Sequence, residues 1–245
     1  MQAIFLGTRG YIEESSRLHR MHSALMLISG GRRLLLDAGE TWRGKLRSLA
    51  PDWIAITHAH PDHSFALAEG TQVPVYVSQE SHDLLARYPV GRFRIFDAGE
   101  LLRLGPFRVR PYDVIHSIRA PAVGFRVSAN GTTLVYNPDV ISIVDEDRVL
   151  RNVDVYVGDG ASLTRPLVRR RDGSLFGHTT VRAQLNWCKR HGIRRAFIVH
   201  CGKQLVEMDP EELSRRVDEL AAPVHAIVAY DGLRVKLRKE SRVVN

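Results

Sequence analysis

The sequence predicts a mixed fold of the α+β or layered α/β class, and three features lead to this expectation. Short apolar runs rich in β-branched residues recur along the chain and are separated by glycine, proline and aspartate, as is typical of strands. Segments with helical periodicity are fewer and lie between these runs. Apolar residues make up 44% of the 245 residues, enough for a substantial core, and we expect residues 1–245 to form a single domain.

The expected strands are short and end at turn-forming residues. Gly30-Gly31 and Asn130-Gly131 are hairpin turn signals, and the closely spaced strands of the first third predict an antiparallel meander. Tyr230-Asp231-Gly232 is interpreted as a further hairpin turn. The expected strands are Ala3–Leu6, Ala24–Ile28, Arg33–Leu36, Trp53–Ile56, Val73–Val77, Phe107–Tyr112 (extended to Ile115), Val123–Val127, Thr133–Tyr136, Val153–Val157, Ala196–Val199, Ala226–Ala229 and Leu233–Leu237.

Three segments are predicted to be helical. Thr180–His191 carries apolar residues at helical spacing, and Gly192 follows it as a C-terminal stop. Asp209-Pro210-Glu211-Glu212 has the order of an N-cap, a first-turn proline and a capping glutamate, and predicts a helix that ends at about residue 221. The third candidate is Glu80–Arg87.

Composition narrows the class of protein. No apolar run approaches the roughly 18–20 residues of a membrane-spanning helix, and the first residues lack the pattern of a secretory signal. The two cysteines, Cys188 and Cys201, form neither a disulfide framework nor a cysteine-rich zinc module. We therefore expect a cytoplasmic protein without a membrane partner. The net charge of +8 favours anionic partners such as phosphates or nucleic acid, although a solvated basic surface is an equally good interpretation.

The densest chemical signal is the segment Thr57–His63, which follows an expected strand. It holds three histidines and one aspartate, which are ligands suited to zinc or iron. Where a chain leaves a strand, His58 and His60 point the same way because side chains alternate with a period of two. Asp62 and His63 lie past the turn and can face a second metal. The alternative, a polar loop of solvated histidines, is weakened by further ligand candidates at later strand ends.

Those later candidates are His116, Asp139 and His200, each placed at or just after the end of an expected strand. A single histidine at a strand end is most often structural. Taken together with the His58–His63 segment, the three residues complete two sites that share one carboxylate. Cys201 adjoins His200, but strand alternation would point its thiol away from the metals, and we interpret it as inert. The other histidines, apart from His178, fit no such pattern.

These motifs resemble, in order, those of the metallo-β-lactamase superfamily of metal-dependent hydrolases. Leu35-Leu36-Asp37-Ala38-Gly39 is similar to the first motif, the His58–His63 segment to the second, and His116, Asp139 and His200 to the third, fourth and fifth. The resemblance implies a four-layer αββα sandwich with the metals at one edge. It assigns His58, His60 and His116 to one metal, Asp62, His63 and His200 to the other, and Asp139 to both, with Asp37 orienting a ligand histidine from behind.

The resemblance also implies the cofactors, which are two divalent ions. We expect zinc, with manganese and iron as alternatives. A hydroxide shared by the two ions would be the nucleophile, because paired metals lower the pKa of water from about 15.7 toward neutrality. Asp62 would serve as a ligand and as a proton acceptor.

Within the superfamily, the sequence is most similar to the phosphodiesterase branch. His116-Ser117, Gly177-His178-Thr179-Thr180 and Ala229-Tyr230-Asp231-Gly232 resemble the tRNA-processing enzymes of the RNase Z type and the phosphoribosyl cyclic phosphodiesterases. Two departures are plain. Only 23 positions separate His116 from Asp139, too few for the long tRNA-binding arm of RNase Z. The cysteine-rich zinc site of the cyclic phosphodiesterases is absent from residues 10–21.

Outside the ligand set, His178 is the strongest catalytic candidate. It lies just before the helix expected near Thr179, where free N–H groups attract anions. There it could bind a phosphate oxygen or protonate the leaving alkoxide, or it could merely cap the helix. The polar stretch Ser162–Gly177 before it is expected to be an active-site loop. Its arginines are candidates for phosphate contacts, with a solvated basic loop as the alternative: Arg165, Arg169, Arg170 and Arg171.

The leading hypothesis is a binuclear metal-dependent phosphodiesterase acting on a small or cyclic phosphodiester. The alternatives are a nuclease of the RNase Z type, a thioesterase or lactonase on the same fold, and a non-catalytic nucleic-acid-binding protein. The complete ligand set argues against the last. A homodimer is one assembly that we consider, and the sequence leaves the oligomeric state and the substrate open.

Overall fold

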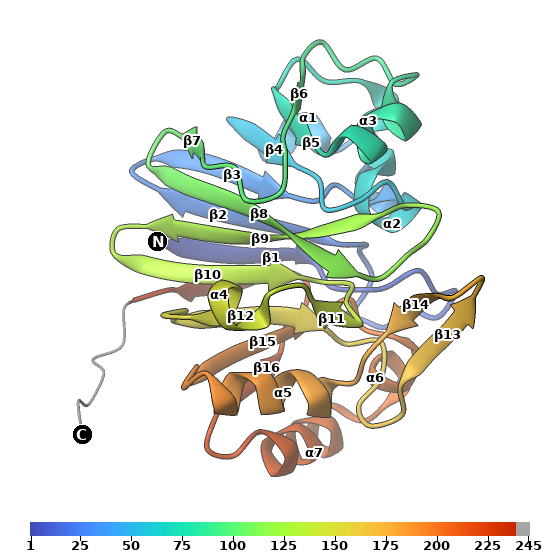
Figure 1. Cartoon of the computed structure of the whole chain (residues 1–245), viewed down its shortest axis with the longest axis vertical. Helices are drawn as coiled ribbons and strands as arrows, with labels where there is room; N and C mark the ends of the chain where they lie inside the picture. Colours follow the sequence, from blue (N-terminus) through green and yellow to red (C-terminus); the bar gives the residue numbers. More distant parts are fainter. Residues whose placement is uncertain (239–245) are drawn as a thin grey trace.

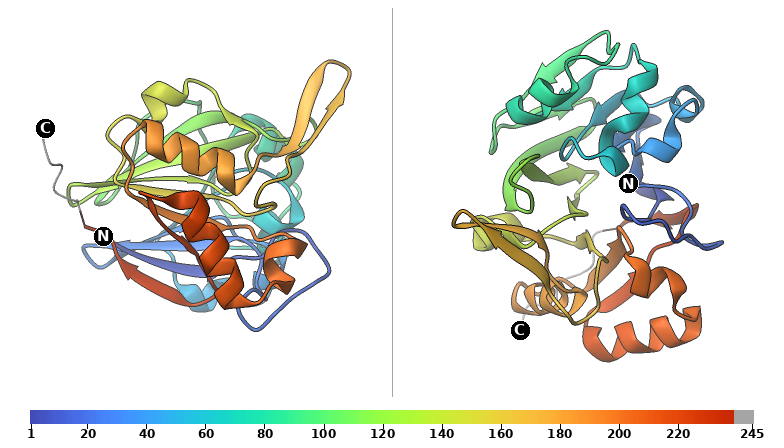
Figure 2. Two further views of the ribbon diagram at one scale, coloured as in Figure 1. Left: turned by 90° about the horizontal axis from the view of Figure 1, so that it is seen from below. Right: turned by 90° about the vertical axis from the view of Figure 1, so that its right-hand side faces the viewer.

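The computed structural model describes residues 1–238, which form two β-sheets packed face to face with helices on their outer faces (Figures 1 and 2). This is the four-layer αββα sandwich that the resemblance implied. The strands are β1 (Gln2–Gly7), β2 (Ala24–Ser29), β3 (Arg32–Leu36), β4 (Trp53–Ala55), β5 (Val75–Val77), β6 (Phe93–Ile95), β7 (Leu102–Leu104), β8 (Phe107–Ile115), β9 (Ala122–Ala129), β10 (Thr132–Asn137), β11 (Ser142–Ile143), β12 (Val155–Asp159), β13 (Leu167–Arg171), β14 (Ser174–His178), β15 (Arg195–Val199), β16 (His225–Val228) and β17 (Leu233–Lys236).

The helices are short, and the two longest, α5 and α7, cover one end of the molecule in Figure 1. Thr180 and Asp209 cap these two helices with their side chains, and the cap at Asp209 is the one that the sequence predicted. The helical segments are α1 (Leu46–Leu49), α2 (Pro61–Ser64), α3 (Gln79–Leu85), α4 (Glu146–Leu150), α5 (Val181–Arg190), α6 (Lys203–Glu207) and α7 (Pro210–Ala221), with 3₁₀ turns η1 (Glu40–Trp42) and η2 (Phe65–Glu69).

Three apolar cores separate the four layers. The central core lies between the sheets and holds the inward side chains of both, including Phe5, Leu27 and Phe125. A second core lies between α5, α7 and the outer face of the second sheet. The third lies between the outer face of the first sheet and the helical segments of residues 46–85. Strands of the first sheet supply both neighbouring cores by alternation, so that in β3 Leu34 faces the central core while Leu35 faces outward.

The first sheet has the strand order β17-β1-β2-β3-β4-β5-β6. Its first three chain-consecutive strands form the antiparallel meander that was expected, with Gly30 and Gly31 in the turn between β2 and β3. From β3 onward the strands run parallel, which the sequence did not predict. The reason is that helical segments connect these strands and return the chain to the same starting edge.

The second sheet has the order β11-β8-β9-β10-β12-β15-β16, with β7 beside β8. Asn130-Gly131 turns β9 into β10, as predicted. The strands β10, β12, β15 and β16 run parallel to one another. Their carboxyl ends therefore meet at one edge, which is where ligands bind in parallel sheets of this kind.

The prediction of a hairpin at Tyr230-Asp231-Gly232 was wrong. The strands on either side belong to different sheets: β16 pairs with β15, whereas β17 pairs with β1. The turn instead carries the chain from one sheet to the other. Asp231 fixes it, because its carboxylate accepts hydrogen bonds from the backbone amides of Thr8, Arg20 and Met21 at 2.7–2.9 Å and from the Thr8 hydroxyl at 2.8 Å.

The expected loop Ser162–Gly177 is also corrected. Most of it forms the antiparallel hairpin β13–β14, which stands apart from both sheets and projects from the body of the protein (Figures 1 and 2). Every residue of β13 is exposed, so the strand carries no alternation of apolar and polar residues. Period-two alternation, the sequence signal of a half-buried strand, is therefore missing. The usable signal was Asp172-Gly173, which forms the two-residue turn with positive φ at both positions and which the sequence analysis overlooked.

Short elements account for the remaining differences. The strands β6, β7 and β11 have only two or three residues, and none was expected. The helical segments α1, α2, α4 and α6 have four or five residues, less than the length over which periodicity can be recognised. Within residues 1–238, no helix combines the length and the apolar character needed to cross a membrane.

The central core generates a stability prediction. Leu27 in β2 is completely buried between the sheets, so Leu27→Ala should lower the free energy of unfolding by about 2–5 kcal/mol through lost contacts and a cavity. The same substitution at Leu84 in α3, which is 46% exposed, should cost less than about 0.5 kcal/mol. Urea unfolding of both variants measures the difference, and equal losses would contradict the layered core.

Candidate metal centre

The structure gathers all seven predicted metal-ligand candidates at one edge of the sandwich, where strands of both sheets end. From the first sheet, the chain beyond β4 and the turn of α2 supply four side chains. The second sheet supplies the others from the ends of β8, β10 and β15. All are buried except His60, which is partly exposed, and they form the cluster His58, His60, Asp62, His63, His116, Asp139 and His200.

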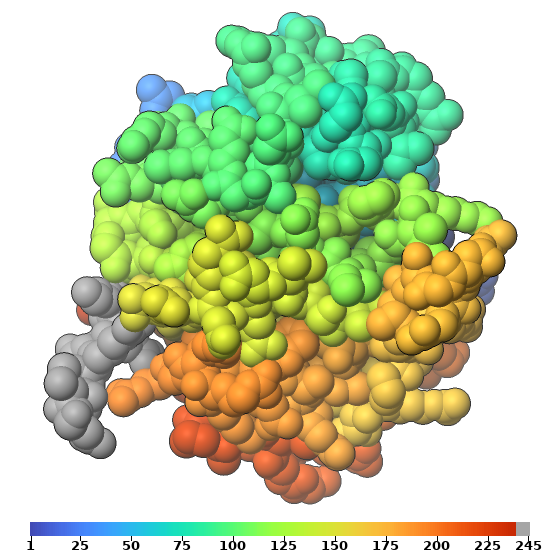
Figure 3. All heavy atoms as spheres, in the orientation of Figure 1, coloured from blue at the N-terminus to red at the C-terminus, as the bar shows by residue number. Residues whose placement is uncertain are grey.

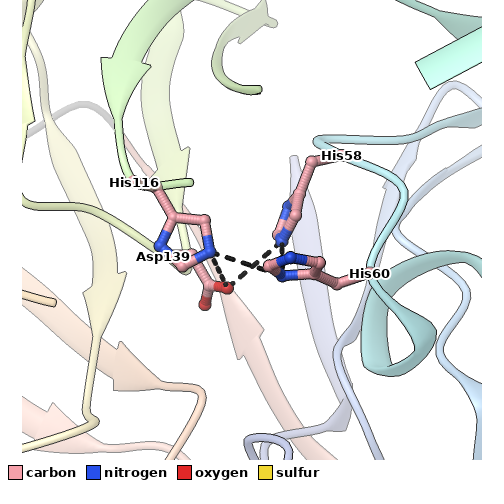
Figure 4. Close-up of side chains that lie close together, drawn as sticks. All are labelled: His58, His60, His116 and Asp139. Atoms are coloured by element: carbon pink, nitrogen blue, oxygen red, sulfur yellow. Dashed lines mark hydrogen bonds and ion pairs between the residues drawn. The ribbon is translucent and has the colours of Figure 1, made fainter. Parts of the chain in front are cut away.

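The first group contains His58, His60, His116 and Asp139, whose ligand atoms all lie within 4.8 Å of one another (Figure 4). His58 Nε2 lies 2.9 Å from His60 Nδ1, and the ring nitrogens of His116 and His60 are 3.5 Å apart. Asp139 Oδ2 lies 3.3 Å from His58 Nε2 and 3.1 Å from His116 Nε2. Three imidazoles and one carboxylate thus point at a common space.

The second group contains Asp62, His63 and His200, again with ligand atoms within 4.8 Å. Asp62 Oδ2 lies 3.0 Å from His200 Nε2 and 3.3 Å from His63 Nε2. Asp139 reaches this group as well, since its Oδ2 is 3.3 Å from His63 Nε2 and its Oδ1 is 3.0 Å from His200 Nδ1. One carboxylate therefore lies between the two groups, which is the arrangement that the resemblance implied.

The histidines of the cluster fall into two groups by the direction in which their pKa is shifted. Burial holds the pKa of His58, His60 and His116 at about 4, so these rings are neutral at pH 7. Burial acts in the same direction on His63 and His200, but neighbouring carboxylates, Asp139 first among them, outweigh it and raise the pKa of both well above the usual value.

Asp37 lies behind the cluster and fixes one of its members. Its buried carboxylate is 2.9 Å from His63 Nδ1 and accepts hydrogen bonds from the Thr57 amide at 2.8 Å and from the Tyr136 hydroxyl at 3.0 Å. The pairing leaves His63 Nε2 directed at the cluster. A carboxylate behind a histidine in this way sets its tautomer and orientation, as is usual around metal sites.

The residues fit divalent cations. His63 Nε2, His200 Nδ1 and Asp139 Oδ1 are buried and make no hydrogen bond to the part of the chain that the structure describes. His200 Nδ1 and Asp139 Oδ1 lie 3.0 Å apart, yet their geometry is not that of a hydrogen bond. Unsatisfied buried polar atoms are costly, and imidazole and carboxylate are the donors that zinc, manganese and iron accept.

His178 lies beside the cluster, but it reaches this position differently from the sequence prediction. The helix α5 begins at Val181, and His178 is the last residue of the hairpin strand β14. Its Nδ1 is 2.7 Å from Asp159 Oδ2, and its ring stacks on that of His200 with centroids 5.4 Å apart. Burial would lower the pKa of His178, but the Asp159 carboxylate outweighs it and raises the pKa.

Asp159 is the residue that sequence reasoning missed. It ends β12, two positions beyond the end of the expected strand, and its carboxylate also accepts the amide of Val140 at 3.1 Å and that of Ala161 at 2.8 Å. The ligand atoms of Asp139, Asp159, His178 and His200 lie within 4.8 Å of one another, so Asp159 belongs to the centre. The sequence did offer a signal, since Gly158-Asp159-Gly160 follows an apolar run. Asp159 is thus a carboxylate at a strand end, as Asp139 is.

The hairpin also fixes His116. The carbonyl of Gly177 accepts a hydrogen bond from His116 Nδ1 at 3.0 Å, which leaves Nε2 directed at Asp139. Gly177 has φ +118°, and a Cβ at this position would lie 1.9 Å from the carbonyl oxygen of Leu167. Only glycine accommodates this close approach, so the Gly177-His178 pair that the sequence singled out has a structural reason.

Two cavities meet at the cluster. The larger, about 810 Å³, is lined by residues of the first loop such as Tyr11 and by Lys203 of α6. The smaller, about 530 Å³, lies between the loop after His116 and the hairpin, where Phe176 and Arg171 line it. Both cavities reach the centre at the same three side chains, His60, His116 and His178.

All four arginines proposed as phosphate contacts are exposed, and of these only Arg171 lines one of the two cavities at the centre, the smaller one. The others are Arg165, Arg169 and Arg170. Cys201 is buried, and burial raises the pKa of its thiol far above the usual range, in keeping with an inert side chain.

Comparison with known families agrees with this geometry. Residues 32–201 match the family described as a β-lactamase superfamily domain, a segment that contains every residue of the cluster. The chain belongs to the metallo-β-lactamase superfamily. It is thus a member of a family of metal-dependent hydrolases, with a histidine and aspartate cluster suited to divalent ions.

The curated relatives are ribonucleases. Ribonuclease TTHA0252 from Thermus thermophilus is 31% identical over 153 residues, which cover 48% of this chain and 35% of that protein. Ribonuclease Z from Streptomyces coelicolor is 34% identical over 101 residues, covering 39% of this chain and 32% of the relative. The chain therefore matches only about a third of the length of these relatives.

Solved structures share the fold at low sequence identity. A diphosphatase from the PhnP family superimposes with a TM-score of 0.73 at 20% identity, covering 96% of this chain and 97% of that one. Zn²⁺-bound PqqB from Methylobacterium extorquens gives 0.76 at 17% identity, covering 97% and 100%. The short form of human tRNase Z gives 0.66 at 19%, covering 97% and 100%. At these identities the likeness shows the fold alone.

The shared carboxylate generates a prediction about metal content. Wild-type protein should retain about two divalent ions per chain, measured by elemental analysis after gentle purification. Asp139→Ala should lose most of both, because Asp139 lies within reach of both groups. Asp113→Ala, which removes an exposed carboxylate from β8 of the same sheet, should keep both ions. Full occupancy in a folded Asp139→Ala variant would contradict the assignment.

Proposed function

We propose that this chain is a metal-dependent phosphodiesterase that acts on a small or cyclic phosphodiester with two divalent ions, zinc being the expected metal. The observation that carries the proposal is the His178–Asp159 pair, 2.7 Å apart, in which His178 lines both cavities at the centre and Asp159 is buried behind it. A centre of ligands alone fits many hydrolytic reactions. A hydrogen-bonding imidazole beside it, held by a carboxylate, suits a substrate with an anionic oxygen or an alkoxide leaving group.

When bound, the two ions supply an activated water as nucleophile and neutralise the charge that develops on the phosphoryl oxygens. The residues of the chain position them. The neutral rings of His58, His60 and His116 would present ring nitrogens to the ions, and Asp37 holds Nε2 of His63 toward the centre. Asp62 lies on the cavity side of the second group, where it can also accept a proton from the attacking water.

His178 supplies a hydrogen bond or a proton to a substrate oxygen, which the metal ligands do not. Its Nδ1 is occupied by Asp159, so Nε2 is the ring nitrogen left for a substrate oxygen. Asp159 favours the protonated ring, which can donate a hydrogen bond to a non-bridging oxygen or a proton to the departing alkoxide. A buried carboxylate that orients a histidine and stabilises its cationic form is a recurrent catalytic arrangement.

The cavities support a substrate with a substituent on each side of the phosphate. They share three histidines and otherwise have different lining residues, so a diester bound at the centre can extend into both. The smaller one offers Arg171 for an anionic group and Phe176 for an apolar or planar one. A thioesterase or lactonase would instead need a largely apolar slot, and we rank this alternative lower.

A nuclease of the RNase Z type is the second candidate. It is supported by the ribonuclease names of the curated relatives and by the basic hairpin beside the centre. Only about a third of each relative is matched, so their names alone do not assign an RNA substrate to this chain. The segment between His116 and Asp139 is also too short for an RNA-binding arm. A non-catalytic nucleic-acid-binding role is disfavoured by the complete set of ligand candidates.

An activity panel with metal-loaded protein tests the proposal. Aryl phosphodiesters and cyclic nucleotides should be hydrolysed in preference to RNA, thioesters and lactones. Turnover of the small diesters should vary little with salt, because few phosphates are bound. Tight RNA binding with a salt slope that implies about six or more phosphate contacts, alongside negligible small-diester turnover, would instead make the protein a nuclease.

His178→Ala gives the sharpest single-residue test. The variant should lower kcat for an aryl phosphodiester by about 10²-fold or more, because proton transfer or a transition-state hydrogen bond is lost. Its metal content should stay at the wild-type level. His225→Ala, an exposed histidine in β16, is the matched control and should be fully active. Unchanged activity would show that His178 has only a structural role, and loss of metal would show that it is a metal ligand.

A further inference from the structure

A second, smaller concave site lies on the outer face of the second sheet, away from the metal centre. It is a cavity of about 310 Å³ between β8, β9 and the end of α4. Figure 1 shows α4 in front of this sheet, and Figure 3 shows the same face with all its atoms. Four arginines line the cavity, and no aspartate or glutamate does: Arg110, Arg126, Arg148 and Arg151.

The two strand arginines face each other directly. Arg110 of β8 and Arg126 of β9 are register partners in the antiparallel pair, so their side chains leave the same face of the sheet. Like charges in this position are destabilising unless an anion lies between them. Arg126 is also half-buried, and burial lowers the pKa of its guanidinium. The charge of Asp154 acts in the opposite direction on Arg126. The pair Arg103 and Arg108 faces in the same way across β7 and β8, so what distinguishes Arg110 and Arg126 is that they line a cavity with two further arginines.

Both guanidinium groups are held in place by backbone carbonyls. Arg110 Nη1 donates to the carbonyl of Gly99 at 2.6 Å, and Arg126 Nη1 donates to the carbonyl of Val149 at 2.6 Å. Each uses one nitrogen in this way and keeps further N–H donors for a ligand. Neither forms an ion pair within residues 1–238, and the same holds for Arg151, whereas Arg148 is paired with Asp145 at 2.7 Å.

We propose that this arginine cavity is a binding site for the terminal phosphate group of a small phosphorylated molecule. A phosphate monoester carries about two negative charges at neutral pH and offers three acceptor oxygens. Planar guanidinium groups bind such oxygens in pairs, and two fixed, adjacent ones need little reorganisation. The concave shape and the small volume suit a compact terminal group better than the continuous backbone of a nucleic acid.

This site is separate from the metal centre. Arg110 lies six positions before His116 along β8 and the residue after it, which corresponds to roughly 20 Å of extended chain. None of the residues that line the arginine cavity lines either cavity of the metal centre. Binding here therefore does not depend on the proposed phosphodiesterase activity.

Isothermal titration of the metal-loaded protein with inorganic phosphate tests the proposal. The double variant Arg110→Gln/Arg151→Gln removes two guanidiniums without touching the half-buried Arg126. Its phosphate affinity at this site should fall at least about tenfold, because charge-assisted hydrogen bonds are lost. Arg108→Gln is the matched control: Arg108 lies on the same strand and face and opposes Arg103 across the β7–β8 pair, but does not line the cavity.

The wild type, the double variant and Arg108→Gln all keep the same metal centre, so phosphate binding there contributes equally to the three titrations. Any difference between them therefore reports on the arginine cavity. Hydrolysis of an aryl phosphodiester should be equal in all three. Identical isotherms for wild type and the double variant would overturn the proposal, as would equal weakening by Arg108→Gln, which indicates diffuse attraction. A dinucleotide without terminal phosphates should bind this site weakly. If it bound and phosphate did not, the site would recognise backbone instead.

Discussion

The carboxylate of Asp139 is the interaction on which the metal centre depends. It lies between 3.0 and 3.3 Å from ring nitrogens of four histidines, two from each sheet. Such a group survives burial only with charge compensation, and the histidines around Asp139 hold its pKa well below the usual range even though burial acts the other way. The two sheets must therefore end at a common edge. The turn at Asp231 contributes to this alignment, since it ties the loop after β1 to the passage between the sheets.

Sequence reasoning located the ligand candidates because a dense run and strand-end positions are local signals. His58 to His63 needed only six residues of context, and Asp139 and His200 follow apolar strands directly. Asp159 was missed because the apolar run, and with it the expected strand, ends at Val157, although β12 continues to pair with β15 as far as Asp159. Pairing partners are not local. The same limit explains why the strands around Asp231 were taken for a hairpin, since only the tertiary fold decides which sheet each one joins.

The hairpin β13–β14 is a different case, because its turn residues Asp172-Gly173 are a local signal whereas its strands show no apolar alternation. A two-stranded ribbon with one fully exposed strand has little apolar burial of its own and is marginal in isolation. It is held where it meets the body, through the Gly177 carbonyl on His116 and through Asp159 on His178. The groups that orient two histidines of the centre are therefore also those that anchor the hairpin. The same contacts therefore set both the geometry of the centre and the position of the hairpin residues that line the smaller cavity.

The position of His178 rests in turn on buried polar groups of the second sheet. Gln184 of α5 pairs with the backbone of Asp159 as a neighbouring strand would, accepting from its amide at 2.8 Å and donating to its carbonyl at 2.7 Å. The Tyr156 hydroxyl donates to the same Gln184 oxygen at 3.0 Å. It accepts from Asn137, whose oxygen accepts the hydroxyl of Tyr112 at the wall of the arginine cavity. Each of these buried groups is satisfied, and removing one would leave its neighbours unpaired at a cost of about 1–3 kcal/mol.

A continuous network of buried hydrogen bonds thus runs through the core from the arginine cavity to the imidazole of His178 beside the metal centre. It explains why α5 contributes a glutamine to an otherwise apolar face: the helix both covers the sheet and fixes the carboxylate that holds His178.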